Sequence, residues 1–322
     1  MKFWEGKKTL VTGGRGFIGS HLVELLAKEG AEVTVPIRSD TRYLGNNKNI
    51  RLVYGDLQNM DFCSEVCKNK DIVMNLAADV GGIEYNIRHQ GSIFRNNLSI
   101  FMNILDASRI NDIERFLTVS SACVYPRHCI IPTPEEEGFI ESPDPSNEGY
   151  GWAKRMEEFL SIAYSKEYNM NIAIARPYNA YGPRDNFDPN SGHVIPALIR
   201  RVMSGENPLI VWGSGEQTRS FLYAEDFARG LMIVTEKYCK ADPVNIGSDE
   251  EVKIKDLANL IVKLSGKKTN IIFDDSKPSG QPRRSCGTKK LFEKTGFRTE
   301  VPLEEGVRRT IEWYRENMTP AI

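Results

Sequence analysis

Short apolar runs alternate with amphipathic stretches through the first half of the chain. Apolar residues recur at helical spacing in most of the gaps, over the longest distances at residues 94–110 and 152–168. Runs rich in β-branched residues predict strands at residues 8–12, 32–37, 50–54, 71–77, 115–120 and 171–176. This alternation is typical of βαβ units, so it predicts an α/β fold with a doubly wound parallel sheet.

The regular alternation ends after residue 176. Segments rich in Gly, Pro and Asn follow, including YNAYGPRDNFDPNSGH (178–193) and SKPSGQPRR (276–284), and they predict a smaller C-terminal α/β substrate lobe. Residues 220–234 and PVNIG at 243–247 predict a return to the helix and strand of the sheet. We therefore expect two interleaved units, a Rossmann-type domain of residues 1–176 with about 217–247 and a lobe of residues 177–216 with about 248–322.

Composition narrows the classes of function. The chain has 322 residues, a formal net charge of -1 and a pI near 6.5, so it lacks the positive charge that nucleic-acid binding needs. The opening residues show no signal pattern, and no apolar run approaches the ~18 residues that span a bilayer. A cytoplasmic enzyme with no membrane partner is expected. Cys63 and Cys67 lie one helical turn apart, and helix packing is favoured over a metal site.

The first strand leads into the glycine-rich loop TGGRGFIGS (12–20). Gly13, Gly16 and Gly19 permit a tight turn, a close approach of backbone to a pyrophosphate, and close helix-to-strand contact. Because a strand precedes this loop and a helix follows it, the pattern predicts dinucleotide binding. Arg15, Phe17 and Ile18 stand between these glycines.

The end of the second strand, PIRSDTR, indicates which dinucleotide is bound. An acid at this position accepts from a ribose hydroxyl, whereas an arginine pairs with a 2′-phosphate. Arg38 stands there, and Arg15 can converge on the same phosphate, so NADP(H) is preferred. NAD(H) stays possible if Asp40 serves the ribose. After the third strand, Asp56 suits an adenine contact, and Leu57 follows it.

A second motif, YGWAK, supplies the reacting groups. Tyr150 and Lys154 are four residues apart at a helix start, so both side chains lie on one face. An ammonium beside a phenol favours the phenolate, and this lowers the expected pKa of Tyr150 toward working pH. Ser121, at the end of the fifth strand, supplies a hydroxyl group nearby.

Together, TGGRGFIGS, the serine strand and YGWAK resemble an extended short-chain dehydrogenase/reductase of the NAD(P)-dependent nucleotide-sugar epimerase/dehydratase family. The chain is most similar there to the GDP-L-fucose synthases, through VGGI (80–83), SSACVYP (120–126), YGPRDNF (181–187), GHVIPALIRR (192–201) and VWGSGE (211–216). ADVGGI (78–83) and SSACVYP are also similar to the GDP-mannose 3,5-epimerases.

The resemblance implies chemistry at a sugar C4 carbonyl. Tyr150 would exchange a proton with the C4 oxygen, tuned by Lys154 and assisted by Ser121. Cys123 would be the base that removes a hydrogen from an adjacent ring carbon, because a thiol of reference pKa about 8.5 is readily made acidic by nearby positive charge. His193 would be the opposing acid, where the GDP-mannose epimerase pattern has a lysine. Ala122 and Cys123 replace the acidic pair of 4,6-dehydratases, which argues against that reaction.

The resemblance also implies two sets of contacts. The cofactor would contact the loop residues and Arg38, Asp56, Leu57, Ala77, Ala78, Tyr150, Lys154 and Pro177. The nucleotide sugar, favoured as a GDP-sugar, would contact Val80, Gly81, Asn179, His193, Arg201, Trp212, Arg219, Arg283 and Arg284, where arginines fork onto phosphate oxygens. Arg219 is expected in a turn before a helix that starts near Ala224.

Four functions follow as hypotheses. The first is a 3(,5)-epimerase/4-ketoreductase acting on a 4-keto GDP-sugar with NADPH, in polysaccharide biosynthesis. The alternatives are a redox-neutral epimerase with tightly held NAD, similar to the GDP-mannose 3,5-epimerases or to a 4-epimerase, and a C4 reductase or dehydrogenase without epimerisation. The last is a non-catalytic regulator that senses the cofactor, which would have no need of Tyr150 and Lys154 together. The wide apolar faces of residues 94–110 and 152–168 suit either a homodimer seam or packing within one chain.

Overall fold

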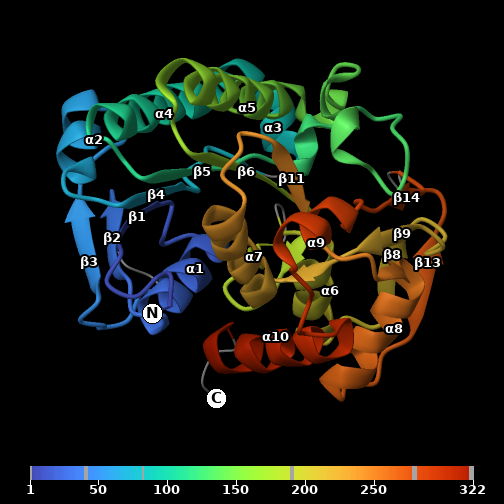
Figure 1. The fold of residues 1–322 in the computed structure, drawn as a ribbon. Helices are drawn as coiled ribbons and strands as arrows, with labels where there is room; N and C mark the ends of the chain where they lie inside the picture. The colour runs from blue at the N-terminus through green and yellow to red at the C-terminus, as the bar shows by residue number, and fades with distance from the viewer. Residues whose placement is uncertain (1, 40–42, 82, 189–191, 278–280, 319–322) are drawn as a thin grey trace.

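A parallel sheet forms the centre of the fold in a computed structural model, which describes residues 2–39, 43–81, 83–188, 192–277 and 281–318. Its seven strands lie in the order β11-β6-β5-β4-β1-β2-β3, all parallel (Figure 1). The strands are β1 (Lys8–Thr12), β2 (Glu32–Ile37), β3 (Ile50–Tyr54), β4 (Ile72–Asn75), β5 (Arg115–Val119), β6 (Ile172–Pro177) and β11 (Pro243–Ile246). The six predicted strands and the return at residue 243 are confirmed.

Helices cover both faces of this sheet. One face carries α2 (Met60–Cys67), α3 (Ile83–Arg88), α4 (Gln90–Ile110) and α5 (Glu148–Tyr168), and the other carries α1 (Phe17–Lys28), α7 (Ala224–Lys237) and α9 (Lys289–Thr295) (Figure 1). Each face buries its own apolar cluster, one around Phe101 and Phe116 and one around Leu22 and Phe227. Strands buried on both faces explain the nearly continuous apolar runs of the sequence.

A smaller group of elements packs beside the sheet. It contains the helices α6 (Val194–Met203), α8 (Ile254–Ser265) and α10 (Leu303–Met318) around the parallel pair β8 (Leu209–Trp212) and β13 (Ile271–Asp274). A three-stranded sheet adds β12 (Glu251–Lys253), β9 (Thr218–Ser220) and β14 (Arg283–Arg284), and a short pair joins β7 (Ala180–Tyr181) to β10 (Leu222–Tyr223). These elements share a third apolar cluster, which includes Ile199, Leu257 and Val307.

The strand order reverses between β1 and β4, because the chain adds strands outward from β1 in one direction and then in the other. Ligands of doubly wound folds bind at such a reversal, beyond the carboxyl ends of the strands. The predicted fold class, a Rossmann-type sheet with a smaller interleaved α/β lobe, is confirmed.

Some local predictions are refined. Arg219 lies in strand β9, which pairs with β12 and β14, so the predicted turn was wrong. The sequence did not indicate this strand because its hydrogen-bonding partners come from distant parts of the chain. The helix expected near Ala224 does begin there. Cys63 and Cys67 are both fully buried in α2, as helix packing requires. Across the described ranges, no helix combines the length and apolarity that crossing a membrane would take.

A buried ion pair fastens α5 to the sheet. Arg176, near the end of β6, donates through Nε and Nη2 to the two carboxylate oxygens of Glu158 at 2.8 and 2.7 Å. The Arg176 side chain is 2% exposed and that of Glu158 is 0% exposed. Glu158 also accepts from the hydroxyl of Ser120 at 2.5 Å, and Arg176 donates to Tyr125 Oη at 2.9 Å. The pair therefore ties helix, strand end and following loop together.

Replacing Arg176 by Ala should lower the free energy of unfolding by about 3–5 kcal/mol, because Glu158 is left buried without a counter-charge. Urea titration measures the change. The double variant Arg176→Met with Glu158→Leu should recover most of the loss, since a well-packed apolar pair can replace a buried ion pair. A double variant as unstable as Arg176→Ala would contradict this explanation.

Candidate active site

Many of the predicted site residues lie at one edge of the sheet, where the parallel strands end. The glycine loop follows β1, Arg38 follows β2, and Asp56 and Leu57 follow β3. Ala77 and Ala78 follow β4, Ser121 follows β5, and Pro177 ends β6. Because all these strands are parallel, residues separated by more than 160 positions come to the same edge.

Two glycines give the loop after β1 its shape. Gly13 has a φ of +66°, and a Cβ there would meet the backbone of Leu76 and Ala77 at 2.8 Å. A Cβ on Gly19 would lie 2.2 Å from the carbonyl oxygen of Gly13, so only glycine allows α1 to start this close to β1. Helix α1 begins at Phe17 with no acidic residue in its first turn. Free amide groups at such a helix start suit a pyrophosphate, so the loop fits a dinucleotide.

Hydrogen bonds of one side chain tie the end of β1 to the end of β4. Thr12 Oγ1 accepts hydrogen bonds from the amides of Leu76 and Ala77, both at 3.1 Å, and donates to Asn75 Oδ1 at 2.6 Å. Along the same edge, Arg38 and Asp56 are exposed, and Leu57 is buried. Asp40, the alternative partner for a ribose, falls outside the described residues.

The segment after β5 brings a hydroxyl and a thiol to the same edge. Ser121 caps the short 3₁₀ helix η1 (Ala122–Val124), and its Oγ accepts from the Cys123 amide at 3.1 Å. Helix α5 comes very close here, since a Cβ on Gly151 would lie 2.5 Å from the Cys123 carbonyl oxygen. Tyr150, the residue before Gly151, lies close enough to Ser121 for the serine side chain to lower the pKa of its phenol. Ser121, Cys123 and Tyr150 are thus adjacent.

The electrostatics of Tyr150 differ from expectation. Burial raises the pKa of its phenol to about 12, although Lys154 and the Ser121 side chain act to lower it. The Lys154 ammonium lies 5.6 Å from the centre of the Tyr150 ring and is itself buried. The sequence indicated the direction of the lysine's effect. The predicted net lowering of the pKa was wrong for the free protein, because removal from water outweighs the neighbouring cation.

A large cavity of about 1060 Å³ opens beside Cys123. Its walls come from the 3₁₀ segment, the loop of residues 125–147, Tyr178 and the region of β14. Arg219, Arg283 and Arg284 also line it. The cavity therefore combines a thiol with three guanidinium groups.

A second cavity of about 400 Å³ adjoins the lobe. Trp212, which is 59% exposed, and Arg201 line it together with apolar residues of α6. Arg219 lines both cavities, so it lies where they approach each other. An aromatic ring in one cavity and a thiol in the other, with an arginine between them, suit a ligand that has a base, a phosphate group and a sugar.

The four predicted arginines are not equivalent. Arg201 donates to both carboxylate oxygens of Glu206, and Arg283 donates through Nη2 to Glu251 Oε1 at 2.6 Å, so their charges are matched by neighbouring acids. Within the described ranges, neither Arg219 nor Arg284 forms an ion pair with a carboxylate. Burial, followed by repulsion from Arg284, lowers the pKa of Arg219. Two unmatched like charges in one cavity are typical of an anion site.

His193 has its own acidic partner. It caps α6, and its Nδ1 lies 3.2 Å from Asp185 Oδ1. The His193 side chain is 69% exposed, whereas that of Asp185 is 1% exposed. The hydrogen bond with Asp185 raises the pKa of His193 above its ordinary value and favours the imidazolium form. Its neighbours Gly192 and Val194 line the cavity of Trp212.

Other predicted contacts lie outside both cavities. Asn179 donates to the Ser220 carbonyl at 2.8 Å, and the Gly81 amide donates to Asn86. Val80 is 53% exposed. Conversely, the cavity beside Cys123 is also lined by residues that were not predicted from the sequence: Arg127, His128, Asn147 and Tyr178. The position of Tyr178 just after β6 was a usable signal, but the loop of residues 125–147 carries no periodic pattern.

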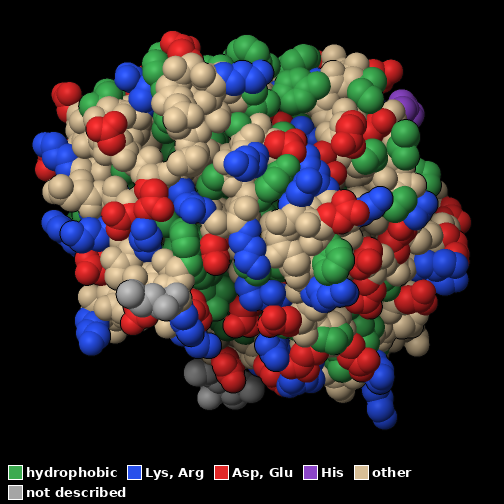
Figure 2. All heavy atoms as spheres, viewed as in Figure 1, with side chains coloured by type: hydrophobic (Ala, Val, Ile, Leu, Met, Phe, Trp, Pro, Cys, Tyr) green, Lys and Arg blue, Asp and Glu red, His purple; other side chains and the backbone are tan. Residues whose placement is uncertain are grey.

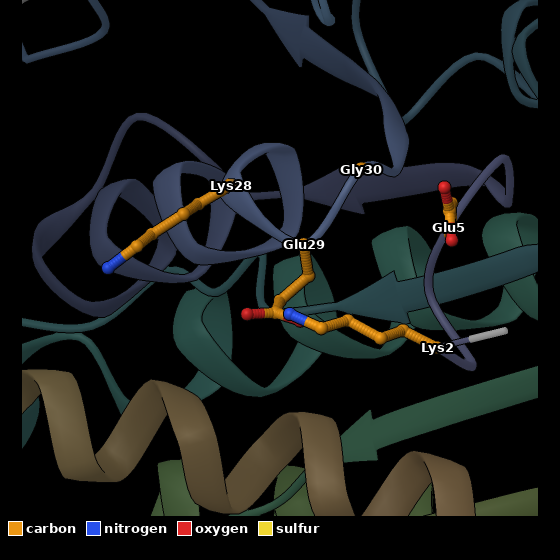
Figure 3. Close-up of a pocket in the computed structure, with 5 residues that line it drawn as sticks. All are labelled: Lys2, Glu5, Lys28, Glu29 and Gly30. Carbon is orange, nitrogen blue, oxygen red and sulfur yellow. The ribbon is translucent and has the colours of Figure 1, made fainter.

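A separate hollow lies at the opposite edge of the sheet. Lys2, Glu5, Lys28, Glu29 and Gly30 line it, and Lys2 pairs with Glu29 at 3.1 Å (Figure 3). It sits where α1 ends and β1 and β2 begin, away from the carboxyl ends of the strands. Figure 2 shows acidic and basic side chains interspersed over one face of the molecule, in keeping with the net charge of -1.

Comparison with known proteins adds to this geometry. The family described as "NAD dependent epimerase/dehydratase family" matches residues 9–247. A GDP-L-fucose synthase of Sinorhizobium fredii is 35% identical over 99% of this chain and 98% of its own length. A GDP-mannose 3,5-epimerase of Arabidopsis thaliana is 31% identical over 98% and 85%. The crystal structure of a GDP-L-fucose synthetase from Naegleria fowleri bound to NADP aligns with a TM-score of 0.83, at 26% identity over 98% and 96%.

Asp185→Asn should lower the pKa of His193 toward or below its ordinary value of about 6.5, because the favourable partner of the imidazolium is lost. Titration of the His193 ring proton by NMR measures this pKa. His193 holds its proton more tightly in the folded protein than in the unfolded chain. The Asp185–His193 pair therefore contributes its full stabilisation at pH values below the pKa of His193 in the unfolded chain. This stabilisation is lost as the pH rises through the higher pKa of His193 in the folded protein. His128 is the internal control. An unchanged pKa of His193 would show that Asp185 is not its partner in solution.

Proposed function

The chain belongs to the NAD-dependent epimerase/dehydratase family, and from this membership we propose that it is a GDP-L-fucose-synthase-like 3(,5)-epimerase and 4-ketoreductase that acts on a 4-keto GDP-sugar with NADPH. The observation that carries the proposal is the cavity that Cys123, Arg219 and Arg284 line together, with Ser121 and Tyr150 close to Cys123. Similarity to the GDP-L-fucose synthases over nearly the full length supports the choice of reaction.

The cofactor site is proposed at the reversal of strand order. Gly13, Gly16 and Gly19, with the backbone of Phe17 and Ile18, would hold the pyrophosphate at the start of α1. Further contacts are proposed from Arg15, Arg38, Asp56, Leu57, Ala77, Ala78, Tyr150, Lys154 and Pro177. NADPH bound there would supply a hydride to the C4 carbonyl. Arg38, exposed after β2, would pair with its 2′-phosphate.

Inversion of a ring carbon is assigned to Cys123 and His193. A ketone at C4 acidifies the hydrogens on C3 and C5, so a thiolate on one face can remove one of them and leave an enolate. The Cys123 sulfur would take that proton, and the His193 imidazolium would return one to the opposite face. Asp185 supports this role, because it favours the protonated imidazole.

Reduction is assigned to the groups around Tyr150. The phenol would donate its proton to the C4 oxygen as the carbonyl becomes a hydroxyl, and Ser121 would donate a hydrogen bond to the same oxygen. Lys154 would stabilise the phenolate that remains. A phenol whose pKa is raised to about 12 is suited to donating a proton rather than accepting one.

Substrate contacts are proposed for the remaining predicted residues. Arg219 and Arg284 would bind the pyrophosphate, with Arg201 and Arg283 near it, and Trp212 would stack on the base. Val80, Gly81 and Asn179 would contact the sugar. We also propose the division into residues 1–176 with about 217–247 for the cofactor and residues 177–216 with about 248–322 for the nucleotide sugar. Leu291 and Phe297 of the second set nevertheless pack into the core of the main sheet.

A homodimer is proposed through α4 and α5, with a product destined for polysaccharides. The two helices pack together over one face of the sheet (Figure 1). Met102 and Ile110 of α4 and Phe159 and Tyr168 of α5 are nevertheless 43–58% exposed. Apolar side chains exposed on one helix pair support a seam with a second copy.

A redox-neutral epimerase is the second candidate, on the similarity to GDP-mannose 3,5-epimerase. Such an enzyme re-reduces the molecule that it oxidised, so it retains NAD tightly. Denaturing the purified protein and identifying any released cofactor separates the two candidates.

Purified protein incubated with NADPH and GDP-4-keto-6-deoxymannose should consume NADPH, followed as loss of absorbance at the nicotinamide band.

In heavy water, Cys123→Ser should abolish deuterium incorporation at the sugar ring while sparing hydride transfer, because only inversion uses the thiol. Cys239→Ser, a thiol outside both cavities, is the matched control and should exchange normally. Unchanged exchange in Cys123→Ser would refute the role of the thiol.

Arg38→Ser should raise the KM for NADPH by roughly 10-fold or more, the loss expected for one charge-assisted contact with phosphate, and should leave the KM for NADH nearly unchanged. Steady-state kinetics with each cofactor measures both. Arg51→Ser, an exposed arginine of β3, is the control. Equal increases for both cofactors would exclude recognition of the 2′-phosphate by Arg38.

A further inference from the structure

A buried carboxylate lies beside the proposed catalytic lysine. Glu157 is on α5, one helical turn after Lys154, and its Oε2 accepts from the Lys154 ammonium at 2.9 Å. The two side chains are 1% and 3% exposed. The same ammonium donates to the carbonyl oxygen of Val119, at the end of β5, at 3.0 Å. The lysine is therefore held from two sides, by its own helix and by the strand that leads to Ser121.

The carboxylate changes the charge that Tyr150 experiences. An isolated Lys154 would present a full positive charge to the phenol, whereas the pair with Glu157 is close to neutral overall. Lys154 lowers the pKa of Tyr150, and Glu157 raises it. Burial raises the pKa of Glu157, and the ammonium opposes this effect, so Glu157 is ionised at the alkaline pH where a tyrosine titrates.

We propose that Glu157 is a positioning residue that fixes the Lys154 ammonium and offsets its charge, so that Tyr150 stays protonated and donates its proton when the C4 carbonyl is reduced. The inference rests on the proposed function, and it specifies the direction of the redox step. A protonated Tyr150 is the form that reduction of a ketone needs, whereas oxidation of an alcohol needs the phenolate. In the reductive step NADPH would supply a hydride to C4 and become NADP⁺. At the same time the phenol O–H bond of Tyr150 breaks, the C4 oxygen gains the proton, and Tyr150 is left as a phenolate beside Lys154.

Other charged groups nearby do not replace Glu157 in this role. Glu158, the next residue of α5, is occupied by Arg176 of β6 at 2.7 Å. Cys123 of η1 also faces Tyr150, and it raises the pKa of the phenol if it ionises. Lys154 faces Tyr150. Burial lowers the pKa of Lys154, but Glu157 and Tyr150, with a smaller contribution from Glu158, outweigh burial and raise it. Glu157 is thus the carboxylate in direct contact with the lysine.

The test is the pH dependence of NADPH-linked reduction in Glu157→Gln. Glutamine keeps an oxygen that accepts from Lys154 but removes the negative charge. Reduction needs the protonated phenol, so its rate falls as pH rises through the pKa of Tyr150. Without the nearby negative charge this alkaline limb should move to lower pH by about one to two units. Glu157→Asp keeps the charge and should keep the limb close to that of the unaltered enzyme.

Three controls separate this effect from damage to the fold. Glu167→Gln makes the same charge change at an exposed position of α5 and should not move the limb. Ring deuterium exchange does not use Tyr150 and should be unchanged in Glu157→Gln. Glu157→Met, of similar volume, is a second neutral variant and should shift the limb in the same direction.

The results are decisive in either direction. A limb that stays in place in the neutral variants overturns the inference, as does a parallel loss of reduction and ring exchange at all pH values, which a purely structural role would produce. Tyr150→Phe tests the underlying proposal separately. If Tyr150→Phe still reduces the substrate, the proposed function fails; if it loses reduction while the neutral Glu157 variants keep the limb, only the role of Glu157 fails.

Discussion

Arg176 of β6 and Glu158 of α5 meet in the interior of the fold, and the arrangement of the candidate site depends on their contact. Glu158 also accepts from Ser120, and Arg176 donates to Tyr125, so the pair fixes both sides of the segment that carries Ser121 and Cys123. Burying two charges is costly, and their hydrogen bonds are close to saturated. The contact holds helix α5 against the end of strand β6. A thiol, a hydroxyl and a phenol thereby share a small volume.

The second constraint is that, within the described part of the chain, only two of the four predicted arginines are paired with acidic side chains. In sequence, Arg201, Arg219, Arg283 and Arg284 are equivalent cations. In the fold, Arg201 and Arg283 are matched by Glu206 and Glu251, whereas Arg219 and Arg284 face a cavity together without such partners in the described residues. An anionic ligand would relieve the repulsion between the latter two, which is the physical reason for placing the pyrophosphate there.

The reacting end combines opposing electrostatic effects. Burial raises the pKa of Tyr150, and Lys154 opposes that rise, while Glu157 weakens the opposition. At the other proposed catalytic group, Asp185 raises the pKa of the exposed His193. Both arrangements favour the protonated form of a group assigned to donate a proton. The two halves of the proposed reaction therefore share one electrostatic design, although they are built on separate elements.

The sequence by itself determined the strands, their order of appearance, the glycine loop, and the Tyr150–Lys154 pair, because these depend on periodicity and short spacing. The resemblance of whole motifs singled out Cys123 and His193. Tertiary structure alone decided that Arg219 lies in a strand between two cavities and that Arg176 finds Glu158. It also decided that burial outweighs Lys154 at Tyr150. The reason is physical: hydrophobic pattern is local, whereas burial and charge pairing depend on groups that the chain brings together from distant positions.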